Sequence, residues 1–392
     1  MGGPLTGIRA LDFTRYQQGP FATALLADLG ADVLKVEPRI DGELGRQSEM
    51  DQSGFSAYFE SYNRGKRSMT LDIRRPEGKR IVEQIVPRVD VLVENFRPGV
   101  MDRYGLGYEA LRLLNPRLVY AAASAFGPEG PLAARPGYDH IAQAVSGLMI
   151  EQAGGPGNDP VPALPGAADQ ISAMLFALGI TSALLARERT GMGQKVQVSL
   201  LGSMLAFQGR QITRYMYTGK QGRTRWRRSP TYSHYRTRDG WVAIAATDPK
   251  MWPHLCRALD RPDMADDPRF AGPWDRHAHA DELETELEAI FSARTVDEWM
   301  DRLVAHDVPS GPVTDYRTVA EDPQVLANGY LATVQHPNLG PIRVAGIPIH
   351  LSGTPAGPVG HAPELGRHTE ETLLDLGYTW EQIVALKEAE VI

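Results

Sequence analysis

IRALDF (residues 8–13), FATALLADL (21–29) and DVLKVE (32–37) follow one another near the start of the chain and decide its fold. The outer two segments are predicted strands, and the middle segment is a predicted helix that Gly19-Pro20 opens. Together they form a βαβ unit with an acid, Glu37, at the end of the second strand, which is the outline of a Rossmann half. The first turn, YQQGP, lacks the G-x-G-x-x-G pattern, so a bound nicotinamide cofactor is not supported.

Strands and helices continue to alternate along the chain. The predicted strands are residues 68–71, 89–94, 118–124 and 194–199, and the predicted helices are residues 76–86, 108–114, 138–149, 170–187 and 200–211. Alternation of this kind predicts an α/β protein with a mostly parallel, doubly wound sheet.

The length of 392 residues favours two domains over a single core. We expect a large Rossmann-like domain over residues 1–212, because the alternation extends that far. Residues 213–229 are rich in arginine, glycine and polar residues, and we expect a linker there. A smaller α/β domain is predicted over residues 230–314, and residues 315–392 are again mixed.

Composition excludes several classes of protein. A net charge of −7 argues against a general nucleic-acid binder. The single cysteine, Cys256, lies in an apolar helical stretch and is expected in the core, and a reducing, cytoplasmic location fits best. No uninterrupted apolar run reaches 18 residues and no signal-peptide pattern is present, so we expect neither a membrane span nor a membrane partner. His277 and His279 have no further metal ligands near them in the sequence, and no metal site is predicted.

Asp169 is the one acid in an apolar run of small residues, PGAAD at 165–169 followed by ISAMLFALG at 171–179. The run predicts a buried helix with the carboxylate in its first turn, where the helix dipole favours negative charge. Two roles are open for Asp169. Aspartate is a preferred helix-capping residue, so Asp169 considered by itself favours a capping role. The small neighbours also leave room for a ligand beside the carboxylate.

Segments spread over nearly the whole chain, in order, closely resemble the class III CoA-transferases, the CaiB/BaiF family. They are LTGIRALDF (5–13), LGADVLKVEP (29–38), NRGKRS (63–68), ENFRPG (94–99), GYD (137–139), RTGMGQKV (189–196) and APELGRHT (362–369). The resemblance implies a Rossmann-like large domain built from both chain ends, with residues 315–392 returning to it, and a small domain between them. It also implies a homodimer of two interlocked rings, with acyl-CoA and a carboxylic acid as substrates and no cofactor beyond CoA.

The resemblance also assigns catalytic residues. Asp169 matches the family's nucleophile, which forms a mixed anhydride with the acyl group and then an aspartyl-CoA thioester. Each tetrahedral intermediate needs fixed hydrogen-bond donors. Gln17 and Tyr138 match the family residues that supply them, although the adjacent Gln18 leaves the register of Gln17 open.

Tyr138 separates two reactions within the family. The related 2-methylacyl-CoA racemases carry a histidine at this position, which exchanges a proton at the α-carbon. Tyrosine, with a reference pKa of about 10, does not suit that task, and His140 is two residues further on. The sequence therefore favours a CoA-transferase and leaves the racemase, and a non-catalytic CoA-binding protein, as alternatives.

Residues that match the family's CoA-binding positions follow the predicted strand 89–94. They are Asn95, Phe96, Arg97 and Arg103, with Leu71, Arg39 and Tyr58 as further substrate-binding candidates. Arginines bind phosphates well, but Arg97 and Arg103 are equally suited to surface ion pairs. The region near Tyr232–Tyr235 lacks the glycine run of formyl-CoA transferase, and residues 46–50 lack its tryptophan. These departures favour an acyl group larger than formyl.

Overall fold

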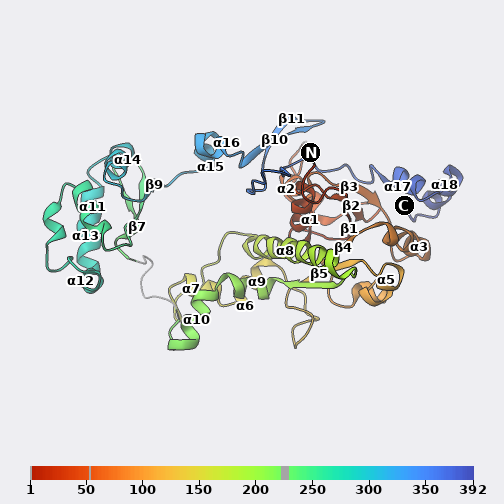
Figure 1. Cartoon of the computed structure of the whole chain (residues 1–392), viewed down its shortest axis with the longest axis horizontal. Coiled ribbons are helices and arrows are strands. Elements are labelled where there is room, and N and C mark those ends of the chain that lie inside the picture. The colour runs from red at the N-terminus through yellow and green to blue at the C-terminus, as the bar shows by residue number, and fades with distance from the viewer. Residues whose placement is uncertain (1, 53, 222–228) are drawn as a thin grey trace. The chain divides into compact units, whose positions relative to one another are not determined.

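The computed structural model describes residues 2–52, 54–221 and 229–392 (Figure 1). The chain divides into two compact units, one of Met1–Gln152, Asp159–Gln221 and Gln324–Ile392 and one of Ala153–Asn158 and Gly222–Pro323. Part of the expected linker is helical, since α10 (Gly209–Thr218) runs through its first residues, and residues 222–228 of that linker lie outside the described residues.

A six-stranded parallel sheet forms the centre of the first unit, in the order β3-β2-β1-β4-β5-β6. The strands are β1 (Arg9–Asp12), β2 (Asp32–Glu37), β3 (Arg67–Thr70), β4 (Val91–Glu94), β5 (Val119–Ser124) and β6 (Lys195–Ser199). This is the doubly wound Rossmann order, and it confirms the predicted parallel sheet. The order reverses between β1 and β4, and ligands of such sheets bind where the strands end at this point.

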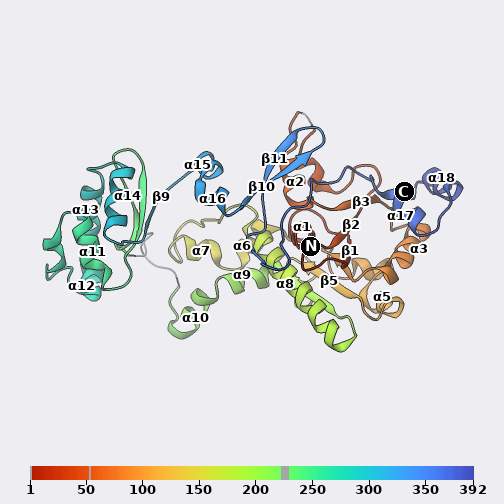
Figure 2. The same cartoon turned by 45° about the horizontal axis from the view of Figure 1, so that its top comes forward.

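Alternate residues of each strand face opposite sides of the sheet, and each side has its own core. Leu11, Leu34 and Leu92 face one side, while Ala10, Val33 and Val91 face the other. The helices of the first side are α3 (Pro76–Ile85), α4 (Val100–Arg103), α5 (Tyr108–Leu114), α17 (Thr369–Asp375) and α18 (Trp380–Glu388). On the second side, α1 (Gln18–Asp28) and α8 (Ala167–Thr190) lie side by side against the sheet (Figures 1 and 2).

This unit contains further elements. They are η1 (Leu44–Gln47), α2 (Ala57–Asn63), η2 (Val86–Arg88), α6 (Asp139–Val145), α7 (Leu148–Gln152), α9 (Leu200–Phe207), α10, and the hairpin of β10 (Leu331–His336) and β11 (Gly340–Ala345). The predicted single helix over 138–149 is wrong, because the chain breaks at Gly147 with φ of 82° and α6 and α7 are separate.

Residues 369–392 pack against the sheet formed by the N-terminal strands. Leu373 and Ile383 are buried in the same core as Leu11. The Asp72 amide donates to the Val391 carbonyl at 2.8 Å, which fixes the segment after α18 beside the end of β3. Both ends of the sequence therefore build the part of the molecule where β1, β2 and β3 end.

The second unit has its own core. This core packs on a three-stranded antiparallel sheet, formed by β7 (Tyr232–Arg236), β8 (Trp241–Ala245) and β9 (Ser310–Pro312). The helices are α11 (Met251–Ala258), η3 (Pro262–Ala265), α12 (Pro273–Ala278), α13 (Ala280–Phe291), α14 (Val296–Ala305) and α15 (Tyr316–Glu321), and α16 (Pro323–Ala327) follows at the boundary. Cys256 is buried among Trp252, Phe291 and Trp299, as the sequence predicted.

By length and composition, α8 is the one helix in the described part of the chain that is apolar enough to cross a membrane. Its inner side chains, such as Phe176 and Ile180, are fully buried against the sheet. A central helix of a folded core passes the same test.

Candidate active site

Asp139, on α6, caps the helix that carries Asp169. The cap position of α8 is Gly166, which has no side chain to offer, and the Asp139 Oδ1 accepts hydrogen bonds from the amides of Ala168 at 2.6 Å and Asp169 at 3.2 Å. Asp169 sits inside the first turn of α8. The capping role that the sequence left open for Asp169 therefore belongs to Asp139.

The Asp169 carboxylate is partly buried and has no hydrogen-bond partner among the residues that the structure describes. None of the described residues donates a hydrogen bond to it, although two amides of the same helix end are taken by Asp139. Burial raises the pKa of Asp169, and the negative charge of Asp139 raises it further, to about 7. Such a carboxylate is poorly solvated in its charged form and is available to attack an electrophile.

Gln17 ends the turn after β1 and packs against the start of α8. Its side chain is 6% exposed, and its amide Nε2 donates to the Gly166 carbonyl at 3.4 Å. Gly166 has φ of 84°, a conformation that favours glycine, and a Cβ there would lie 2.3 Å from that nitrogen and push the Gln17 amide aside. The neighbouring Gln18 reaches Ser172 instead, at 2.7 Å. Of the two glutamines, Gln17 is the one at the first turn of α8.

Tyr58 and Tyr62, one turn apart on α2, bring two phenols toward Asp169. Their rings meet edge to face with centroids 4.9 Å apart. Burial raises the pKa of each, and the charge of Asp169 raises it further, so both stay neutral and able to donate hydrogen bonds. Tyr62 was not predicted from the sequence. Its spacing of four residues from Tyr58 was the signal that would have found it.

Tyr138 lies at the cap of α6, directly before Asp139, and its side chain is 61% exposed. Its ring meets that of Tyr16 edge to face at 5.8 Å. Tyr16 has φ of 62°, a left-handed conformation that is unusual for a non-glycine residue, and its amide donates to the buried Glu43 carboxylate at 2.9 Å. Strained backbone of this kind is typical of functional sites, and here it adjoins Gln17.

A cavity of about 630 Å³ opens where β1, β2, β3 and β4 end. Three of the predicted CoA-binding residues, Arg39, Leu71 and Phe96, line it. Sequence reasoning missed the other lining residues, among them Arg15, Arg74, Arg75 and Tyr104. Arginines beside apolar and aromatic side chains suit a ligand that combines phosphates with a flat ring.

Asn95, Arg97 and Arg103 do not line this cavity. Both amide atoms of Asn95 bond the backbone of Arg15, with Nδ2 donating to its carbonyl at 2.9 Å and Oδ1 accepting from its amide at 2.8 Å. Asn95 thus holds the loop that carries Arg15, whose guanidinium lies 4.8 Å from the Phe96 ring centre. Arg97 and Arg103 are exposed, and their role in CoA binding stays a prediction.

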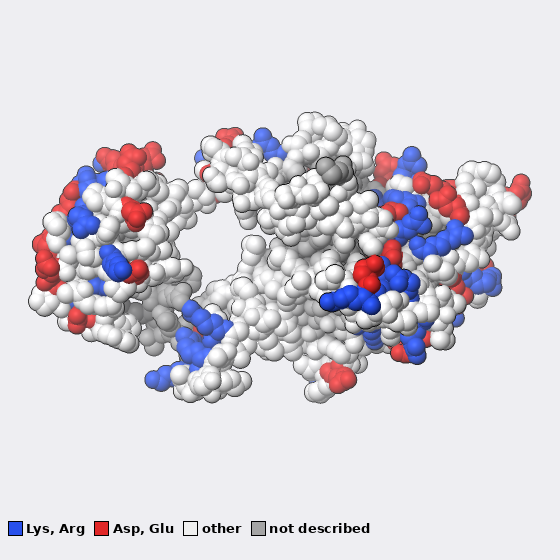
Figure 3. Space-filling view, viewed as in Figure 1, with Lys and Arg blue, Asp and Glu red and all other residues white. Residues whose placement is uncertain are grey.

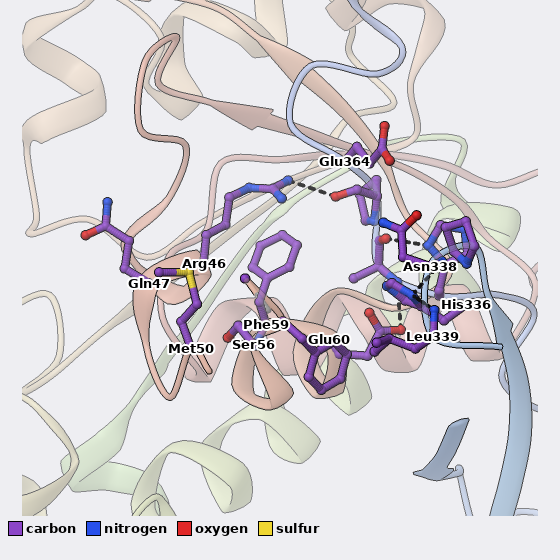
Figure 4. A pocket seen from close by; sticks show the side chains of 16 residues that line it. Arg46, Gln47, Met50, Ser56, Phe59, Glu60, His336, Asn338, Leu339 and Glu364 are labelled. Atoms are coloured by element: carbon purple, nitrogen blue, oxygen red, sulfur yellow. Dashed lines mark hydrogen bonds between the residues drawn. The ribbon is translucent and has the colours of Figure 1, made fainter. Parts of the chain in front are cut away.

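A second cavity, of about 530 Å³, lies against the face of α2 that carries Phe59, as Figure 4 shows. Phe59 and Glu60 line it, together with His336 on the β10–β11 hairpin. The Glu60 carboxylate accepts a hydrogen bond from the Ala362 amide at 2.9 Å. None of the predicted site residues lines this cavity, and the described part of the chain contains no group of three metal-binding side chains.

Comparison with known proteins decides the family. The family model "CoA-transferase family III" matches residues 5–369. The chain belongs to CoA-transferase family III. It is similar to the succinyl-CoA:mesaconate CoA-transferase of Haloarcula hispanica, with 37% identity over 96% of this chain and 97% of that protein. It is also similar to the succinyl-CoA:glutarate CoA-transferase of Mus musculus, with 35% identity over 95% and 86% of the two chains.

Among solved structures, a CaiB/BaiF family protein from Brucella suis aligns with a TM-score of 0.85. It is 32% identical, and the alignment covers 96% of this chain and all of that one. Membership of the family identifies the chain as an enzyme of the acyl-CoA:carboxylate CoA-transferase type, as the sequence motifs predicted.

Proposed function

We propose that this enzyme moves CoA from an acyl-CoA to a carboxylic acid through covalent intermediates on Asp169. The observation that carries the proposal is the state of that carboxylate. It lies in the first turn of α8 without a hydrogen-bond donor in the described part of the chain, while Asp139 caps the helix. A purely structural carboxylate at a helix end would accept those amide hydrogens itself.

The steps balance without any other reagent. An Asp169 carboxylate oxygen attacks the thioester carbonyl, the C–S bond breaks, and CoA leaves as a thiolate. The thiolate attacks the aspartyl carbonyl of the anhydride, which forms the aspartyl-CoA thioester and frees the donor acid as a carboxylate. The acceptor carboxylate attacks the aspartyl carbonyl of that thioester, the C–S bond breaks, and CoA leaves again as a thiolate. The thiolate then attacks the acyl carbonyl of the new anhydride, which releases the new acyl-CoA and restores Asp169.

Four side chains are assigned to support these steps. The Gln17 amide and the Tyr138 hydroxyl donate to the oxyanions that form at the two carbonyl carbons. The neutral phenols of Tyr58 and Tyr62 orient the acyl group beside Asp169. The CoA moiety lies in the cavity lined by Arg39, Leu71 and Phe96, where arginines meet its phosphates.

The relatives' names suggest a substrate class. The similar proteins from Haloarcula hispanica and Mus musculus are named for succinyl-CoA as one partner and for mesaconate or glutarate as the other. We therefore propose dicarboxylic acids as donor and acceptor. This agrees with the acyl group larger than formyl that the sequence favours.

We further propose that the enzyme works as an interlocked homodimer, with residues 1–212 and 315–392 forming its CoA-binding part and residues 230–314 its small domain. Apolar side chains on one stripe of α8, Met174, Leu178 and Leu185, are 51–62% exposed. Figure 3 shows few charged side chains over the region where Figure 1 shows α8 and α9. An exposed apolar face of this kind marks a protein interface.

The test incubates the enzyme with succinyl-CoA and a panel of dicarboxylic acids in deuterated water and follows the acyl-CoA products by liquid chromatography and mass spectrometry. The proposal predicts a new acyl-CoA only when an acceptor is present, with no deuterium at the α-carbon. Deuterium exchange in a branched acyl-CoA without any acceptor would instead identify a racemase. CoA binding with neither reaction would identify a binding protein.

A further inference from the structure

Glu390 pairs with two of the arginines that line the cavity where β1 to β4 end. Its carboxylate lies 3.0 Å from Arg39 and 3.9 Å from Arg75, and all three residues line the cavity. A third lining arginine, Arg74, pairs with Asp72 at 2.8 Å. Two acids of the protein itself, Glu390 and Asp72, therefore already pair with three of the four arginines that line the cavity.

The backbone holds Glu390 in that place. Its φ is 55°, and its amide donates to the Lys387 carbonyl at 2.9 Å. The next two residues, Val391 and Ile392, are buried, and the Val391 carbonyl accepts the Asp72 amide. The side chain is 61% exposed, so it can move aside, but its Cα stays at the cavity.

We propose that Glu390 competes with the phosphate groups of CoA for Arg39 and Arg75 and so weakens CoA binding. This inference rests on the proposed function, because it takes the ligand of the cavity to be CoA. Each time CoA binds, a phosphate must replace the Glu390 carboxylate on Arg39, and the displaced carboxylate stays nearby as a like charge. A weaker hold on CoA favours release of the acyl-CoA product.

Removing the charge of this lining residue should make CoA bind more tightly, whereas loss of a contact in a binding site ordinarily weakens binding. Glu390→Gln keeps the size of the side chain and removes its charge. We expect the Kd for CoA, measured by isothermal titration calorimetry at about 0.05 M salt, to fall roughly threefold to fivefold, the upper part of the range expected for an exposed ion pair. The gain should shrink at about 0.5 M salt, because exposed charges are then screened.

Glu371→Gln is the matched control. Glu371 is 59% exposed and lies 3.6 Å from Arg67, so this variant removes the same charge from a similar exposed pair outside the cavity. Tighter binding in Glu390→Gln alone supports the inference. Equal Kd values in Glu390→Gln and wild type, or an equal gain in both variants, would overturn it. If wild type binds no CoA at all, the proposed function fails instead.

Discussion

Asp12 and Asp169 are both aspartates with little access to water, and their surroundings differ completely. The Asp12 carboxylate is fully buried and accepts hydrogen bonds from Lys66 at 3.0 Å, Thr23 at 2.7 Å, and both the amide and hydroxyl of Thr14. Asp169 accepts none from the residues that the structure describes. One end of the sheet thus holds a fully paired acid and an unpaired one.

Their pKa values diverge accordingly. Burial alone would raise the pKa of Asp12, but the charges of Lys66 and Lys35 and the two threonines outweigh it and lower the value to about 2. Burial raises the pKa of Asp169, Asp139 adds to it, and the result is about 7. Pairing makes a buried carboxylate structural, and the lack of pairing leaves it reactive.

The largest effect is expected from Asp169→Ala. Transfer should fall by roughly 10³-fold or more, because no other carboxylate of the site is placed to carry the acyl group. The Kd for CoA should change little, since the cavity does not include Asp169. Steady-state kinetics and calorimetry check both parts. Turnover near the wild-type rate would remove Asp169 from the mechanism.

Asp12→Asn should act on stability. Lys66 would lose its carboxylate partner inside the protein, and breaking a buried ion pair costs about 3–5 kcal/mol. Urea unfolding followed by circular dichroism measures the loss, while the folded variant should keep its transfer activity. A variant as stable as wild type would show that the pairing around Asp12 is incidental.

Asp169→Asn should stabilise the protein slightly. A carboxylate whose folded pKa is raised to about 7 lowers the free energy of unfolding as the pH rises from about 4 to about 7, because the folded state binds the proton more tightly. Replacing it should therefore gain roughly 1 kcal/mol at pH 8, after allowing for its partial contact with water, and nothing near pH 4. Thermal unfolding at the two pH values measures this, and a gain independent of pH would contradict the raised pKa.

The smallest effect is expected from Asp139→Asn. The asparagine oxygen can still accept the Ala168 amide, but the negative charge is gone. The pKa of Asp169 should fall, and the acid limb of kcat/KM should move from near pH 7 to lower pH by roughly half a unit. A pH–rate profile of both enzymes checks it. An acid limb that does not move to lower pH would mean that the charge of Asp139 does not act on Asp169.

The sheet was predictable because its signals are local. Each strand and each crossover helix has its own apolar pattern, and the alternation alone implies parallel pairing. The break at Gly147 was missed because a glycine inside an apolar run is compatible with a continuous helix.

The site was predictable only in part. Motif resemblance pointed to Asp169, Gln17 and Tyr138. It did not reveal that Asp139 caps a helix that begins 28 residues later, because that interaction is a tertiary contact. Glu390 likewise reaches Arg39 only through the fold. For Asn95 the motif suggested a ligand contact, and the fold adds that its amide holds the backbone of Arg15, while its role in CoA binding stays a prediction.

The central claim is that Asp169 carries the acyl and CoA groups during turnover. Intact-protein mass spectrometry after brief mixing with succinyl-CoA tests it most directly, with peptide mapping and a hydroxylamine-treated sample. The prediction is a CoA-sized adduct on Asp169 that hydroxylamine removes and that Asp169→Ala lacks. Transfer activity in wild type without an adduct, or the same adduct in Asp169→Ala, would contradict the claim.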